Sequence, residues 1–334
     1  MKAIVYHHYG SPDVLKCEEI EKPTARDNEV LIRVRASSVN PLDCGVPTGG
    51  ARIVTGLRKP KVTRLGVDVA GQVEAVGRNV TQFKPGDEVF GACIRDPQGS
   101  SVGVWVCQGA FAEYACAPES TLVLKPPNVT FEQAASAPVA AFTALQGLRD
   151  KGHIQPGQKV LINGAAGGVG TFAVQIAKSF GAEVTGVCST GNVEMVRSIG
   201  ADDVIDYTQD DFTKLGRRYD LIFDCISNHS LSACKRVLAP KGKLIMAGDQ
   251  SGRGMTGILA RLFTAVISSW FVSQKLMTVL ARPNKEDLTI MHDLMKAGTL
   301  NPVIDKRYSL SEVPEAIRYV RKKHARGKVV ITLD

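Results

Sequence analysis

Residues 163–170 read NGAAGGVG, with four glycines in eight positions, and this stretch decides the fold of the second half of the chain. The apolar run KVLI (159–162) precedes it, and TFAVQIAKSFG (171–181) follows it. This order predicts a buried strand, a tight glycine turn and a helix that ends at Gly181. A strand that passes through such a turn into a helix is the first unit of a parallel sheet.

Strand and helix patterns alternate on both sides of this turn. Helices are predicted for FEQAASAPVAAFTALQGLRD (131–150), NVEMVRSIG (192–200) and LSACKRVLA (231–239). Short apolar runs predict strands at EVTGVCS (183–189), DVIDY (203–207), YDLIFDC (219–225) and KLIMAG (243–248). The order predicts right-handed βαβ units and a doubly wound parallel sheet, which is an α/β fold.

The rest of the chain differs in composition and in its pattern of polarity. The first 125 residues are rich in glycine, proline and β-branched residues, and runs such as EVLIRVRASSV (29–39) alternate in polarity. An antiparallel or barrel-like β domain is therefore predicted there. After residue 272 come a predicted helix, 285–298, and a final strand, KVVITL (328–333). We expect a β domain over 1–125, the parallel-sheet domain over 126–272, and a return segment, 273–334, that completes the first domain.

Length and composition exclude several classes of protein. A chain of 334 residues with 44% hydrophobic and 22% charged residues suits a two-domain globular protein. The N-terminal sequence MKAIVYHHYG has no secretory or transit pattern, so we expect a cytoplasmic protein. The most apolar window, 258–272, contains Arg261 and is shorter than the roughly 20 residues of a membrane span. We therefore expect no membrane span and interpret the window as a buried helix and strand.

Cysteines and charges narrow the choice further. The eight cysteines include no C-x-x-C pair, which argues against a zinc ribbon and a redox dithiol. Part of the net charge of +8 lies in two basic clusters, 52–64 and 318–328. No aromatic interleaving or nucleic-acid motif accompanies them, so we expect no nucleic-acid partner. A solvated face is the main interpretation of these clusters, and attraction of an anionic cofactor or substrate is the alternative.

The glycines after the first parallel strand predict a ligand as well as a fold. A helix N-terminus carries unpaired amides and a partial positive charge, and a pyrophosphate reaches them only where no Cβ intervenes. The stretch departs from G-x-G-x-x-G at its first glycine, where Ala165 follows Gly164, and a purely structural turn is the alternative. The predicted dinucleotide-binding residues are Gly164, Ala165, Ala166, Gly167, Gly168, Val169 and Gly170.

The residues after the second parallel strand predict which dinucleotide binds. NAD sites usually carry Asp or Glu there, about 20 residues beyond the glycines, to bind the ribose 2′-hydroxyl. Here the strand is followed by Ser189, Thr190 and Asn192, without an acid. Hydroxyls and amides donate to a 2′-phosphate, whereas a carboxylate repels it, so NADP(H) is favoured. Tyr207 at the end of the third strand is a further candidate, and Arg197 is either another or a solvated helix residue.

Several further motifs occur in one order along nearly the whole chain. They are GSPDVL (10–15), ASSVNPLD (36–43), LGVDVAGQVEAVG (65–77), FKPGDEVFG (83–91), GAFAEYA (109–115), APVAAFTALQGL (137–148), LGRRYDLIFDC (215–225) and HARGKVVI (324–331). With the glycine stretch, they resemble a medium-chain dehydrogenase/reductase of the zinc-independent quinone oxidoreductase branch. The resemblance implies a GroES-like β-barrel catalytic domain and a Rossmann-type dinucleotide domain. It also implies a homodimer, in which an edge strand at the apolar stretch 266–272 pairs across a two-fold axis.

The resemblance also bears on metal binding. Zinc-dependent relatives have a catalytic cysteine and a Gly-His-Glu sequence in the first domain, and the positions matching the latter here are Gly66, Val67 and Asp68. Cys44 lies near the cysteine position, but one thiol without the histidine does not make a site of three protein ligands and a water. We therefore expect no metal. Without a Lewis acid, the favoured hydride acceptors are quinones and conjugated enones.

The resemblance assigns residues to the reaction itself. Asn40 matches an asparagine near the nicotinamide ribose and the substrate, and Thr143 matches a threonine near the nicotinamide. Gly248 is expected where the fifth strand ends against the cofactor, and Lys323 and Lys328 near the adenosine phosphate or the active-site edge. For each of these lysines a solvated face is the main interpretation. The alternatives for the other three residues are a turn asparagine before proline, a hydroxyl bonded to its own helix and a turn glycine.

Other polar residues receive a structural interpretation. We expect Asp43 and Asp68 to form ion pairs or caps rather than to act as general acids, and His229 to lie in a surface loop. The branch often has a tyrosine where residues 44–48 read CGVPT, so no proton donor is assigned. The sequence thus predicts an NADPH-dependent reductase of small-molecule quinones or α,β-unsaturated carbonyls. The alternatives are an enoyl-thioester reductase and a cofactor-binding regulator or scaffold with little turnover.

Overall fold

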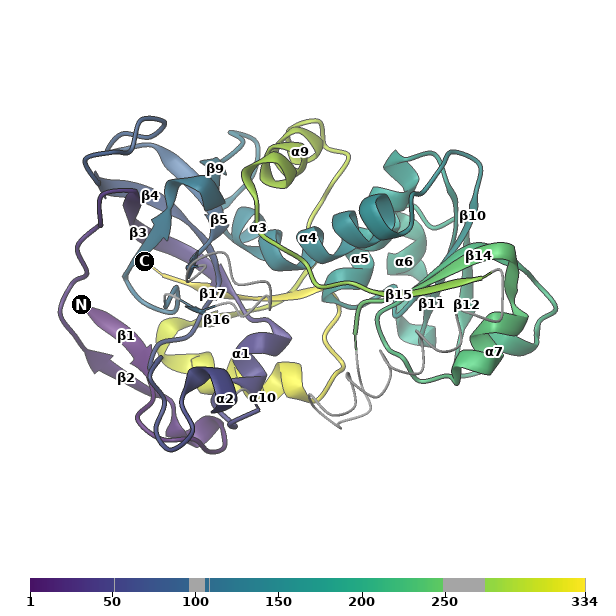
Figure 1. Cartoon of the computed structure of the whole chain (residues 1–334), viewed down its shortest axis with the longest axis horizontal. Coiled ribbons are helices and arrows are strands. Elements are labelled where there is room, and N and C mark those ends of the chain that lie inside the picture. Colours follow the sequence, from purple (N-terminus) through teal and green to yellow (C-terminus); the bar gives the residue numbers. More distant parts are fainter. Residues whose placement is uncertain (51, 96–105, 108, 249–273, 334) are drawn as a thin grey trace. The chain divides into compact units, whose positions relative to one another are not determined.

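The computed structural model describes residues 1–50, 52–95, 106–107, 109–248 and 274–333 (Figure 1). The chain forms two compact units. The first, called the mixed-sheet unit below, comprises Met1–Phe142, Arg282–Gly298 and Pro302–Asp334. The second, the parallel-sheet unit, comprises Thr143–Ala281 and Thr299–Asn301. The unit boundaries at Phe142 and Ala281 lie later in the chain than the expected 125 and 272.

The described part of the parallel-sheet unit contains six parallel strands in the order β12-β11-β10-β13-β14-β15. Its first strand, β10, is central, and the chain adds strands outward to β12 on one side and to β15 on the other. The sheet is therefore doubly wound, as expected, and the carboxyl ends of β10 and β13 form a switch point of the kind where α/β proteins bind ligands. The strands are β10 (Lys159–Asn163), β11 (Glu183–Cys188), β12 (Asp203–Asp206), β13 (Tyr219–Asp224), β14 (Leu238–Met246) and β15 (Lys275–Thr278).

Buried apolar side chains hold this sheet between its helices. β10 buries every residue after Lys159, as a strand covered on both faces does. Helix α5 (Gly168–Ser179) buries all of residues 170–177. One core cluster joins Leu161, Ile222 and Leu244 from three neighbouring strands. Two shorter helices are α6 (Val193–Ser198) and α7 (Leu231–Arg236).

The mixed-sheet unit contains a seven-stranded sheet in the order β16-β17-β3-β4-β5-β9, with β8 also paired to β3. The last strand of the chain, β17, pairs with β3 near the start of the chain, with Val330 opposite Ser38. The C-terminal strand thus lies inside the sheet that the N-terminal segment begins. The strands are β3 (Glu29–Ser38), β4 (Asp68–Val76), β5 (Glu88–Ala92), β8 (Tyr114–Pro118), β9 (Leu122–Leu124), β16 (Ile304–Ser309) and β17 (Lys328–Thr332).

Short helices and two small sheets complete the mixed-sheet unit. β1 (Lys2–Val5) pairs with β2 (Lys16–Glu19), and β6 (Ile94–Arg95) pairs with β7 (Val106–Cys107). The helices are α1 (Pro41–Gly45), α2 (Arg52–Thr55), α3 (Phe131–Ser136), α9 (Lys285–Lys296) and α10 (Val313–Arg321). Because α3 contacts β3, β4 and β5, the chain between residues 126 and 136 belongs to this unit.

The single helix expected over residues 131–150 is wrong. The structure divides it into α3, α4 (Pro138–Gln146) and the π-helix η3 (Gly147–Lys151). The first break falls before Pro138, because proline suits the first turn of a helix but lacks the N–H that a helix interior requires. The apolar window 258–272 lies outside the described residues. Within the described part of the chain, no helix is long and apolar enough to cross a bilayer.

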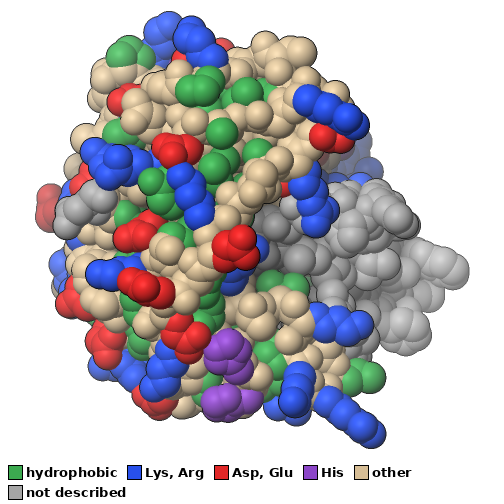
Figure 2. All heavy atoms as spheres, turned by 90° about the vertical axis from the view of Figure 1, so that its left-hand side faces the viewer, with side chains coloured by type: hydrophobic (Ala, Val, Ile, Leu, Met, Phe, Trp, Pro, Cys, Tyr) green, Lys and Arg blue, Asp and Glu red, His purple; other side chains and the backbone are tan. Residues whose placement is uncertain are grey.

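Charged side chains of both signs are interspersed on the surface of the mixed-sheet unit. Figure 2 shows Lys and Arg beside Asp and Glu across the face it presents, with hydrophobic side chains in small separate groups. Arg318 of the basic C-terminal cluster, for example, pairs with Asp13 and with Glu315. Its positive charge is therefore offset locally, as expected for a solvated face.

Candidate active site

The glycine turn follows the carboxyl end of the central strand β10. Gly164 has φ of 85°, a conformation that favours glycine. The amides of Gly164 and Ala165 donate to the Val187 carbonyl on β11 at 3.1 and 3.0 Å, and the Gly167 amide donates to the Gly164 carbonyl at 3.0 Å. The turn is thus fixed to the neighbouring strand before α5 begins.

Two glycines of this turn have different spatial reasons to lack a side chain. A Cβ on Gly170 would lie 2.0 Å from the Gly164 carbonyl oxygen, so this glycine lets the helix pack on the turn. Among the described residues, a Cβ on Gly167 would meet only that same oxygen, at 3.4 Å. Gly167 is also the N-cap of α5 and supplies no capping side chain. The first amides of this twelve-residue helix therefore suit an anion such as a pyrophosphate, which fits the chemistry expected of a dinucleotide.

The predicted adenosine-binding residues lie together at the carboxyl ends of β11 and β12. Ser189 precedes the short 3-10 helix η4 (Thr190–Asn192), and the Ser189 hydroxyl accepts a hydrogen bond of 2.9 Å from the Asn192 amide. Tyr207 follows β12 and is 59% exposed. The structure adds a residue that the sequence reasoning missed: Asp206 is the register partner of Cys188, so its carboxylate belongs to the same edge of the sheet. The sequence signal for this residue was the second acid of DVIDY (203–207), which ends the strand that follows β11 in the chain.

A second polar group lies at the switch point. The Asn163 amide donates to Asp224 at 2.8 Å and to Asn228 at 3.0 Å, and the Ser227 hydroxyl donates to the Gly248 carbonyl at 2.8 Å. A Cβ on Gly248 would lie 2.2 Å from the Cys225 carbonyl oxygen. Gly248 thus lies just beyond β14, the fifth strand of the parallel sheet, as predicted. Its closest neighbour there is the Cys225 carbonyl in the loop after β13.

In the mixed-sheet unit, Asn40 is the centre of a buried polar network. It caps α1 and is 2% exposed. Its backbone N–H donates to Asp43 at 2.9 Å, and its side-chain amide donates to Asp68 Oδ2 at 2.8 Å. Its carbonyl oxygen accepts a hydrogen bond of 2.6 Å from Lys328 Nζ. Both ends of the Asn40 side chain are therefore oriented by charged neighbours.

Asp68 is fully buried and is satisfied by protein donors. Its Oδ2 accepts from the Ser38 hydroxyl at 2.5 Å and lies 3.5 Å from Lys328 Nζ, and its Oδ1 accepts from the Val139 amide at 2.9 Å. Asp43 accepts from the amides of Asn40 and Gly66. The expectation that these two acids form ion pairs or caps is confirmed. We call Ser38, Asn40, Asp68, Val139 and Lys328 the Asn40 network.

The solvated face expected for Lys328 is wrong, since this lysine is only 4% exposed. β17 lies between β16 and β3, so its first residue enters the interior and its ammonium group reaches Asn40 and Asp68. Burial lowers the pKa of Lys328, and Asp68 opposes that shift. Burial also raises the pKa of Asp43 to about 7, against the two amides that it accepts from. These groups are costly to bury unpaired, which explains why the network is so completely hydrogen-bonded.

Cys44, near the position of the catalytic cysteine in zinc-dependent relatives, has a raised pKa. Burial, with a further contribution from Asp43, raises the pKa of Cys44 to about 12. Val67, at the position where zinc-dependent relatives have histidine, is a fully buried core residue. Among the described residues, no group of three or more His, Cys, Asp and Glu side chains is arranged to hold a metal ion.

The remaining predicted residues lie in both units. Thr143 is half-buried in α4 and belongs to the parallel-sheet unit, as do the glycine turn and the adenosine-binding residues. Asn40 and the exposed Lys323, which follows α10 with φ of 61°, belong to the mixed-sheet unit. His229 is not simply a surface-loop residue, because its ring packs edge-on against Phe212 with 4.6 Å between centroids.

Comparison with known proteins gives a consistent result. Residues 26–127 match the family described as alcohol dehydrogenase GroES-like domain, and residues 199–331 match zinc-binding dehydrogenase. The chain is 34% identical over 343 residues to the chloroplastic quinone-oxidoreductase QR1 of Triphysaria versicolor, covering 99% of this chain and 98% of that protein. It is 34% identical over 341 residues to the chloroplastic NADPH-dependent alkenal/one oxidoreductase of Arabidopsis thaliana, covering 99% and 79%.

A solved structure shows the same likeness over the whole chain. The quinone oxidoreductase from Coxiella burnetii has a TM-score of 0.83 and 28% identity, with 100% of this chain and 99% of that one covered. The GroES-like and parallel-sheet domains occur in the expected order in the sequence. The chain therefore belongs to the medium-chain dehydrogenase/reductase superfamily of oxidoreductases.

Proposed function

We propose that this protein is a zinc-independent, NADPH-dependent reductase that transfers hydride to a quinone or an α,β-unsaturated carbonyl compound. The observation that carries the proposal is the state of Asp68. Its carboxylate stands at the position matching the glutamate of Gly-His-Glu and is saturated by Ser38, Asn40, Val139 and Lys328. With this carboxylate held by protein donors and Val67 in place of the histidine ligand, these positions supply no Lewis-acid site, and the acceptor takes hydride without metal assistance.

Such a reaction needs a site that binds the cofactor and a group that orients the acceptor. We assign the first function to the glycine turn and the second to the Asn40 network. The NADPH nicotinamide supplies the hydride. The first amides of α5 bind the cofactor's pyrophosphate, and Ser189 and the open end of β11, which carries no acid, admit the 2′-phosphate. Holding donor and acceptor in the reactive geometry provides much of the rate. The remaining proton comes from solvent, because no tyrosine follows the N-x-x-D sequence here.

Asn40 is the proposed contact to substrate or to the nicotinamide ribose, with Thr143 near the nicotinamide and Lys323 near the cofactor phosphates. A carbonyl oxygen has two lone pairs, and Lys328 occupies one of those on Asn40. The same side chain faces the Asp43 backbone amide in the capping box of α1. Because Lys328 and Asp68 determine which end of the side-chain amide is oxygen, that oxygen has a defined position.

An acceptor panel tests the proposal. Metal-chelated protein should oxidise NADPH with 9,10-phenanthrenequinone, a benzoquinone or an alkenal, and should leave a simple ketone unreduced. An enoyl-CoA in the panel separates the enone assignment from an enoyl-thioester reductase. In the same assay, Asn40→Ala should retain about a tenth of the turnover or less, as expected for loss of an oriented hydrogen bond. Loss of all turnover on chelation would contradict the proposal, and tight NADPH binding without turnover would favour a regulator.

We also propose a homodimer, which rests on the position of β15 at the edge of the parallel sheet among the strands that the structure describes. Exposed sheet edges commonly pair across a two-fold axis. The apolar stretch 266–272, to which the sequence assigned that edge, lies outside the described residues. Light scattering on the size-exclusion peak should give twice the chain mass of 35.9 kDa, and a mass of one chain would exclude the dimer. Location in the cytoplasm stays a prediction.

A further inference from the structure

The carboxylate of Asp206 controls the hydrogen-bond directions at the proposed adenosine site. Its Oδ1 accepts from the Thr208 backbone amide at 2.9 Å and from the Thr208 hydroxyl at 2.8 Å. The Thr208 hydroxyl also lies 3.0 Å from the hydroxyl of Thr190. Each hydroxyl has one hydrogen to donate. Because the Thr208 hydroxyl donates to Asp206, the single Thr190 hydrogen is also directed at this pair, toward the Thr208 oxygen or the Asp206 carboxylate.

Thr190 is therefore an acceptor toward any ligand. Its hydrogen is directed to the Thr208–Asp206 pair, which leaves only lone pairs on its oxygen. Hydrogen bonds from Thr190 above all, and then from Thr208, lower the pKa of Asp206, so the carboxylate is ionised near neutral pH. The sequence argument counted the Thr190 hydroxyl as a donor to a 2′-phosphate. The hydrogen-bond chain that ends on Asp206 reverses its direction.

Of the neighbouring groups, the Ser189 hydroxyl can still donate to a phosphate, because it accepts from Asn192 and keeps its own hydrogen. Asn192 Oδ1 is buried and receives no hydrogen bond from the described residues, so it adds no donor for a phosphate. The cation on the adjoining helix, Arg197, lies 3.4 Å from Glu194 and is shared with that carboxylate. A ribose 2′-hydroxyl can donate a hydrogen bond to the Thr190 oxygen. A 2′-phosphate brings only acceptors and negative charge.

We propose that Asp206 is a specificity-determining residue of the cofactor site and keeps the preference for NADPH over NADH small. The inference rests on the proposed function only in taking the ends of β11 and β12 as the place where the adenosine ribose binds. No carboxylate after β11 repels the 2′-phosphate, so the phosphate can enter. The carboxylate of Asp206, at the end of the neighbouring strand, weakens its binding. Both cofactors should therefore bind, with affinities within about tenfold of each other.

The informative change is Asp206→Asn. An asparagine oxygen still accepts from the Thr208 amide and hydroxyl, so the turn after β12 is preserved while the charge is removed. Repulsion between a partly exposed carboxylate and a phosphate at about 6 Å in a water-like dielectric corresponds to about fivefold in affinity. We expect NADPH to bind about fivefold more tightly to Asp206→Asn, and NADH to change by less than about twofold.

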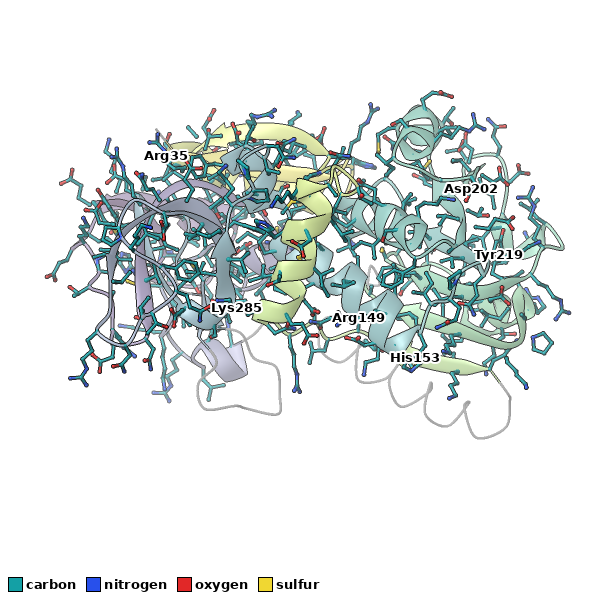
Figure 3. All side chains as sticks on the ribbon, turned by 90° about the horizontal axis from the view of Figure 1, so that it is seen from above. Arg35, Arg149, His153, Asp202, Tyr219 and Lys285 are labelled. Atoms are coloured by element: carbon teal, nitrogen blue, oxygen red, sulfur yellow. The ribbon has the colours of Figure 1, made fainter. Side chains whose placement is uncertain are left out.

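The matched control is Asp150→Asn, which removes one negative charge elsewhere in the same unit. Asp150 is paired with Arg149 on η3, and η3 leads into the amino end of β10, away from the cofactor edge. Figure 3 labels Arg149 and the neighbouring His153 there. This variant should leave the affinities for both cofactors unchanged within about twofold. It separates the local effect of Asp206 from a change in net charge.

The measurement is a calorimetric titration of wild type and both variants with NADPH and NADH, without any acceptor, at low and at high salt. The expected selective gain for NADPH in Asp206→Asn should shrink at high salt, because exposed charges are screened. An equal change for both cofactors would show that Asp206 only shapes the turn, and no change would also overturn the inference. Binding with this selectivity but no turnover in the acceptor panel would contradict the proposed reaction and leave the assignment of Asp206 intact.

Discussion

Lys328→Met should lower the stability of the mixed-sheet unit much more than replacement of the exposed Lys323. Methionine fills the same space, but it leaves the fully buried Asp68 carboxylate without its cation and Asn40 without the donor to its oxygen. Removing one partner of a buried ion pair typically costs about 3–5 kcal/mol. For a unit of this size, the transition temperature should fall by about 10 °C in a thermal melt.

Two further variants make this result specific. Lys323→Met replaces an exposed lysine of the same C-terminal segment and should shift the melt by less than about 2 °C. Lys328→Met combined with Asp68→Asn removes both charges, so the double variant should lose less stability than the sum of the two single variants. Additive losses, or a melt of Lys328→Met no lower than that of Lys323→Met, would contradict the ion pair as the source of stability.

The second large effect concerns the glycine turn: Gly170→Ala should abolish tight cofactor binding and also destabilise the parallel-sheet unit. The added Cβ would stand 2.0 Å from the carbonyl oxygen and 2.8 Å from the carbonyl carbon of Gly164, both backbone atoms, so the turn or α5 must shift. Overpacking of this kind costs about 1–3 kcal/mol. A displacement of about 1 Å at a positioned site can cost about a hundredfold, and we expect a loss of that size in NADPH affinity.

Gly167→Ala is the matched comparison, because it adds the same methyl group three residues earlier. Its Cβ would meet the Gly164 oxygen at 3.4 Å, an ordinary contact, so the melting temperature should stay close to that of the wild type. The methyl group projects toward the space where the pyrophosphate is proposed to approach, so affinity should still fall. Calorimetry with NADPH and a thermal melt on each variant separate the two outcomes. Wild-type affinity in both variants would place the pyrophosphate elsewhere.

Much of the parallel-sheet unit could be predicted because its information is local. The strands are short apolar runs, Gly181 and Gly200 follow the ends of α5 and α6, and the glycine turn lies between β10 and α5. Strand order then follows from the handedness of βαβ units rather than from particular side chains. Pro138 could have indicated a helix start within residues 131–150, because proline suits the first turn. The continuous apolar pattern led instead to the prediction of one long helix.

The sequence by itself determined the doubly wound sheet, the β-rich first segment, the position of the glycine turn and the superfamily, because these depend on periodicity, turn chemistry and ordered motifs. Only the tertiary structure decided what Lys328 and Asp206 contact. Lys328 meets Asn40 and Asp68 across 288 and 260 residues of sequence, and Asp206 meets Thr190 through Thr208 across two adjacent strand ends. Burial, and the direction of each hydrogen bond, depend on which distant groups the fold brings within about 3 Å, and a linear pattern of residues does not contain that information.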